Sequence, residues 1–240
     1  MNVSTSCRYH FLEYKWAIIA FYLVFFILSG ISKIYFMAEP DSSFSGLETG
    51  TVFFLFISGI SSFHSVFLFH IQCGSTRKTQ FCGWLLFSAL ICTFMTIFNT
   101  VIVYVMSALS LNIDSPVFYF SESSPILGTL TATMMLFCIN LFFLQLGYFF
   151  AISFYRLGFW GKWLFGSFLV VSFFLIISSD SFLLNLSQPL QILQQAPVPT
   201  PVLISAILFS LAAALAGLCR LMTKNAPCQT QNSSTGIFAL

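Results

Sequence analysis

Ionisable side chains are rare in the apolar stretches of this chain, and their spacing does not favour acid–base catalysis by a pair of them. His64 and His70 share one stretch, while Asp180 and Lys33 lie at the ends of others. The two histidines are six residues apart, which puts them on different faces of a helix. No pair of these groups forms an acid–base dyad. We therefore expect no catalytic residue in this chain.

Cofactor and metal chemistry has equally little support. The chain has seven cysteines but no C-x-x-C pair, and no histidine stands at a spacing that suits zinc. No phosphate-binding or metalloprotease motif is present. We therefore expect neither ATP nor Mg²⁺ to bind this chain itself. The formal charge of only +2 says little about partners, and no nucleic acid partner is expected.

Three uncharged amides lie within the apolar stretches, at Asn99, Asn140 and Gln145. Such groups can bond helix to helix in a membrane, and they can also line a path for a polar part of a substrate. Both interpretations stay open from sequence. These residues are the candidate substrate path.

The turn Gly74-Ser75-Thr76-Arg77-Lys78 concentrates glycine, hydroxyls and two adjacent cations between two long apolar runs. Gly74 can end one helix, and Ser75 or Thr76 can cap the next. Arg77 and Lys78 can bind acidic or carbonyl groups of a partner. The competing interpretation is that the two cations only orient the chain in the bilayer.

The basic turn and the three amides must be positioned by membrane-spanning segments, because 58% of the 240 residues are hydrophobic and only 7% are charged. Stretches of about 20 apolar residues cross the hydrocarbon layer. We therefore predict an all-α polytopic membrane protein. The six predicted spans are Trp16–Met37, Gly50–Ile71, Phe81–Met106, Ile126–Phe154, Trp163–Ser179 and Pro201–Met222.

Charge gives the orientation of these spans. Eight of the nine cations fall in segments on one side, whereas most carboxylates fall in the opposite segments. Cations mark the cytoplasmic side. Residues 1–15 are predicted to form a cytoplasmic amphipathic helix at the membrane surface, and residues 16–222 a six-span domain. Residues 223–240 are predicted to form a polar tail, so both termini are placed in the cytoplasm.

The longest outer segment, Asp180 to Thr200, is half apolar and carries no charge after Asp180. Its Phe182–Gln195 portion favours a re-entrant or interfacial hairpin over a solvated loop. Backbone at membrane depth must be shielded by protein. We therefore expect this hairpin to pack between spans five and six.

The six spans, the inward termini and the G-x-[ST]-R-K turn together resemble the permease subunits of bacterial ABC-2-type ABC transporters. In that family the segment matching Phe69–Phe81 holds the helix that couples to the ATPase. The run Leu146-Gly147-Tyr148 with Phe154–Gly158 and the outer hairpin are similar too. The chain departs from full-length exporters in having neither an ATPase domain nor a large outer domain.

The resemblance implies a permease of the bacterial cytoplasmic membrane that pairs with a second permease subunit, identical or related. A separate ABC ATPase would hydrolyse ATP and contact Gly74 to Lys78. The substrate would be hydrophobic or amphipathic, such as a peptide, a lipid or a drug, and export is the expected direction. The alternative is a membrane scaffold without transport, such as an immunity or regulatory protein.

Overall fold

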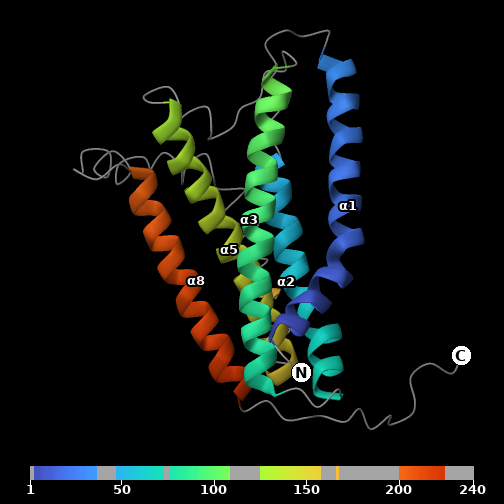
Figure 1. Ribbon diagram of the computed structural model, residues 1–240, viewed down its shortest axis with the longest axis vertical. Coiled ribbons are helices and arrows are strands. Elements are labelled where there is room, and N and C mark those ends of the chain that lie inside the picture. Colours follow the sequence, from blue (N-terminus) through green and yellow to red (C-terminus); the bar gives the residue numbers. More distant parts are fainter. Residues whose placement is uncertain are drawn as a thin grey trace, which may run out of the picture.

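The computed structural model describes residues 3–36, 47–72, 76–108, 125–157, 166–167 and 200–224. All regular structure in these ranges is helical, which confirms the all-α prediction. The helices are α1 (Val3–Phe36), α2 (Leu47–Gln72), α3 (Arg77–Ala108), α5 (Pro125–Leu157) and α8 (Thr200–Lys224) (Figure 1). α2, α3, α5 and α8 each contain one of the spans expected from sequence, and α1 covers the span from Trp16 as far as Phe36.

Four helices in the described part of the chain are long and apolar enough to cross a membrane. The stretches concerned are Val3–Ile27, Arg77–Ala108, Ile126–Tyr155 and Val202–Lys224. α2 adds a shorter apolar stretch, Leu47–Phe63. The chain is therefore a multi-pass helical membrane protein. Two further expectations, the span Trp163–Ser179 and the hairpin Phe182–Gln195, fall outside the described residues, apart from the two helical residues 166–167.

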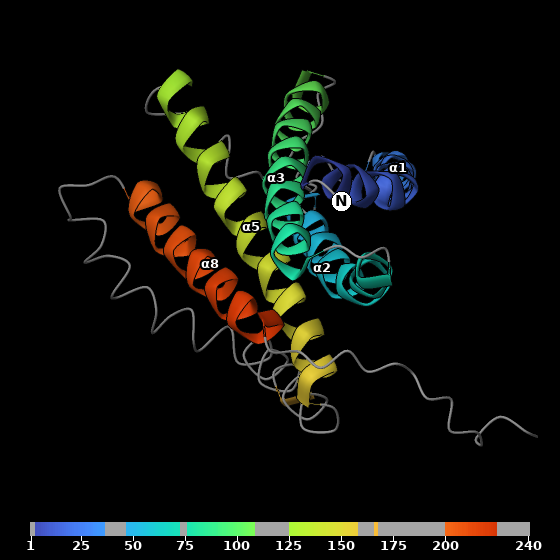
Figure 2. The same cartoon turned by 60° about the horizontal axis from the view of Figure 1, so that its bottom comes forward.

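Most of residues 1–15, predicted to form an amphipathic helix at the membrane surface, make up the first turns of α1. α1 is a single helix from Val3 to Phe36, and no proline occurs before Pro40. Figure 2 shows the first turns of α1 running toward α3. One face of these turns, with Ser6, His10 and Tyr14, is buried. The segment therefore packs as part of the bundle.

The direction of each helix follows from its cross-contacts. Gln80 near the start of α3 bonds Tyr148 near the end of α5, and Tyr104 near the end of α3 bonds Thr129 near the start of α5. α3 and α5 are therefore antiparallel. The start of α3 also contacts the end of α8, so α8 runs antiparallel to α3 as well. It follows that α5 and α8 are parallel to each other.

α3 contributes four fully buried side chains to the core: Trp84, Phe87, Ile91 and Met95. α5 makes the most extensive contacts of the fold, mainly with α2 and α8. A side chain added at Gly59 of α2 would collide with the backbone of α5. The backbones of α2 and α5 therefore approach each other closely at Gly59, as a small residue allows.

Candidate functional site

The described part of the basic turn is the first turn of α3. The Thr76 hydroxyl accepts a hydrogen bond from the Thr79 backbone N–H at 3.2 Å, and the Thr76 carbonyl accepts one from the Gln80 N–H at 3.1 Å. Thr76 is thus the N-cap of α3, as the sequence predicts. Gly74 and Ser75 lie outside the described residues.

Arg77 makes a contact that the sequence did not predict. Its guanidinium Nη1 donates a hydrogen bond to the backbone carbonyl of Lys224 at 2.7 Å. Lys224 is the last residue of α8, where helix carbonyls lack partners within the helix and carry the negative end of the helix dipole. Arg77 therefore ties the start of α3 to the end of α8. Lys78, by contrast, is exposed.

Other cations at this end of the described bundle are also exposed. The exposed ones on α1 are Arg8 and Lys15, and those on α8 are Arg220 and Lys224. Glu13 is the carboxylate placed among them, while Glu48 begins α2 at the opposite end. The arrangement gives this end of the protein a positive surface, in line with the cytoplasmic side predicted from sequence.

Asn99 bonds three helices together. It accepts a hydrogen bond from the Tyr22 hydroxyl of α1 at 2.9 Å and donates one to the Thr51 hydroxyl of α2 at 2.8 Å. Its side chain is 3% exposed. These contacts fit the interhelical role that was weighed for this amide from sequence.

Asn140 and Gln145 join α5 to α3. Asn140 donates a hydrogen bond to the Thr96 hydroxyl at 3.0 Å. Gln145 accepts one from the Trp84 indole at 3.3 Å and donates one to the Ser88 hydroxyl at 3.2 Å. Gln145 also borders a cleft.

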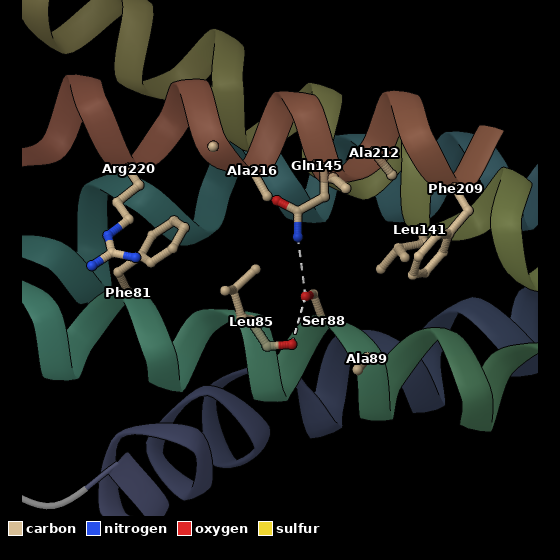
Figure 3. A pocket seen from close by; sticks show the side chains of 12 residues that line it. Phe81, Leu85, Ser88, Ala89, Leu141, Gln145, Phe209, Ala212, Ala216 and Arg220 are labelled. Atoms are coloured by element: carbon tan, nitrogen blue, oxygen red, sulfur yellow. Dashed lines mark hydrogen bonds between the residues drawn. The ribbon is translucent and has the colours of Figure 1, made fainter. Parts of the chain in front are cut away.

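That cleft measures about 430 Å³ and lies between α3 and α8, with α5 as its floor. Figure 3 shows Arg220 and Phe81 facing each other from α8 and α3 at one end, with Phe209 and Leu141 at the other. Gln145 lies midway, pointing at Ser88. The α8 wall is otherwise formed by small residues: Ala212, Ala213, Ala216 and Gly217.

Below the cleft lies an aromatic pair that sequence reasoning missed. Trp84 of α3 stacks on Tyr148 of α5, with ring centroids 4.3 Å apart and planes inclined by 15°. Gln80 donates a hydrogen bond to the Tyr148 hydroxyl. The available signal was the spacing of Gln80, Trp84 and Ser88, which places polar and amphipathic residues on one helix face.

No cluster of three metal-ligating side chains occurs among residues 3–36, 47–72, 76–108, 125–157, 166–167 and 200–224. Comparison of the chain with protein-family models, with curated proteins and with solved structures found no match in any of the three.

Proposed function

We propose that this chain is the permease subunit of an ABC-type transporter in a bacterial cytoplasmic membrane, with ATP hydrolysed by a separate ATPase. It works as a homodimer or with a related permease subunit. The transported molecule is hydrophobic or amphipathic, and export is the proposed direction. The observation that carries this proposal is the bond between Arg77 and the end of α8 at the positive end of the bundle.

A permease must pass force from its partner into its spans, so the contact surface must be rigid. Thr76 fixes the first turn of α3, and Arg77 fixes that turn to α8. Motion applied to the turn would thus reach α3 and α8 together. Lys78 and the other exposed cations supply the charge that an acidic partner surface would meet.

The topology supports a sixth span. Since α5 and α8 are parallel, the proposed topology takes both from the outer to the cytoplasmic side and needs an odd number of crossings between them. The apolar window Trp163–Ser179 of the sequence is long enough for one crossing of about 30 Å with modest bilayer thinning. We therefore propose six spans with both termini in the cytoplasm.

The test is reconstitution with an ABC ATPase encoded beside the gene of this chain. Tagged full-length chain and ATPase are co-expressed, purified and placed in proteoliposomes. We expect a stable complex whose ATP hydrolysis depends on both chains, with the ATPase inactivated at its phosphate-binding lysine as the control. A scaffold would leave ATP hydrolysis and transport unchanged, and that result would refute the proposal.

The Arg77 variants separate the coupling role from the orientation role. Arg77→Ala should lower stimulated ATP hydrolysis about tenfold, the factor expected when a charge-assisted hydrogen bond of about 1.4 kcal/mol is lost. Arg77→Lys keeps the orientation charge but not the planar donor group, so it should recover only part of the activity. Normal activity in a normally inserted Arg77→Ala protein would leave the turn as an orientation signal only.

A further inference from the structure

We propose that the cleft between α3 and α8 binds one anionic phospholipid of the cytoplasmic leaflet, with the headgroup phosphate on Arg220 and an acyl chain along α8. This lipid site does not depend on the proposed transport role. The cleft volume of about 430 Å³ falls in the usual range for small-molecule sites.

The position of Arg220 fits a headgroup. It precedes the end of α8 at Lys224 by one helical turn, or about 6 Å. Both side chains are exposed, and a spacing of four residues puts them on the same helix face. The described residues give the Arg220 guanidinium no carboxylate partner. Basic pockets between spans on the cytoplasmic side are suited to anionic headgroups.

The length of the cleft fits one acyl chain in one leaflet. Its α8 wall runs from Arg220 to Phe209, which is about 16 Å at 1.5 Å per residue. Half of a 30 Å hydrocarbon layer is about 15 Å. The charged end of the cleft therefore lies at headgroup depth, and its other end lies near the middle of the bilayer.

The walls of the cleft suit hydrocarbon rather than a polar solute. Gln145 on the floor uses its carbonyl oxygen for the Trp84 indole and an N–H for Ser88. The Ser88 hydroxyl in turn donates to the Leu85 carbonyl. These polar atoms are thus engaged within the protein. Nothing lies within 4 Å of a side chain built on Gly217, so the α8 wall leaves room for a chain.

The test measures binding of phosphatidylglycerol to the full-length chain in mild detergent, followed through a fluorescent acyl label. Phosphatidylcholine with the same label is the comparison lipid. Arg220→Gln should weaken phosphatidylglycerol binding about fivefold. It should weaken phosphatidylcholine binding by a smaller factor, because the choline cation offsets the charge of the phosphate. Arg8→Gln is the matched control, since Arg8 is an equally exposed arginine on α1 outside the cleft. It should change neither.

The variant Gly217→Phe tests the acyl position, since it fills the cleft and should weaken both lipids. Leu218→Phe, at an exposed residue of α8 outside the cleft lining, is the matched control and should leave binding unchanged. The proposal is overturned if Arg8→Gln weakens phosphatidylglycerol binding as much as Arg220→Gln does, because the headgroup preference would then be a general effect of surface charge. It is also overturned if Gly217→Phe binds lipid normally or does not yield a monodisperse protein. Either result would mean that another part of the chain fills the space.

Discussion

The crossing of α2 and α5 makes one perturbation especially informative, the change Gly147→Ala. A Cβ at Gly147 would collide with the Phe56 carbonyl oxygen and lie 3.1 Å from the Phe56 carbonyl carbon and 3.2 Å from the Ile60 nitrogen. A Cβ at Gly59 would likewise collide with the Leu144 carbonyl oxygen and lie 3.0 Å from the Tyr148 nitrogen. Each glycine therefore faces the backbone of the other helix.

The size of the effect follows from what has to move. A clash with a side chain can be relieved by rotation, but a backbone can yield only if the whole helix shifts. Overpacking of a core costs about 1–3 kcal/mol, and the upper end applies to a backbone contact. A gap of 0.5–1 Å also removes about a quarter to a half of the dispersion energy of the contacts it separates. We expect Gly147→Ala to destabilise the fold by about 3 kcal/mol.

Reversible unfolding in mixed micelles with rising fractions of a denaturing detergent, followed by circular dichroism, measures this cost. Gly217→Ala is the matched control, because a side chain there meets nothing within 4 Å. It should be neutral or slightly stabilising, since alanine favours a helix over glycine by up to about 1 kcal/mol. Equal stabilities of Gly147→Ala and Gly217→Ala would refute the backbone contact between α2 and α5.

Three further outcomes are expected. Asn99→Leu should destabilise the fold by only about 1 kcal/mol in the same unfolding assay, since interhelical hydrogen bonds average about 0.6 kcal/mol each; a loss above 3 kcal/mol would contradict this. Gly83→Ala should destabilise through its contact with the Ser6 side chain, and adding Ser6→Gly should restore part of the loss, whereas purely additive effects would exclude direct contact. Reporter fusions at Leu240 and Asp41 should report opposite sides of the membrane, and signals from the same side would overturn the orientation.

The sequence by itself determined the class of protein and the positions of its helices. An apolar stretch in a bilayer must satisfy its backbone hydrogen bonds within itself, so long uncharged runs can only be helices here. The runs predicted from Gly50, Phe81, Ile126 and Pro201 accordingly became α2, α3, α5 and α8. The Thr76 cap was also readable, because capping depends on residues only three positions apart.

The tertiary structure alone decided which partners the polar residues find. The bond from Arg77 to the Lys224 carbonyl joins residues 147 positions apart, and nothing local to Arg77 distinguishes it from an orientation charge. The turns before Trp16 bury one face, with Ser6, His10 and Tyr14, and local amphipathicity cannot tell lipid from a neighbouring helix. Hydropathy gives each span its length, and the charges in the flanking segments give its direction. The rotation and tilt that bring Gly59 against α5 and leave Gly217 beside a cleft depend on how all the helices pack together.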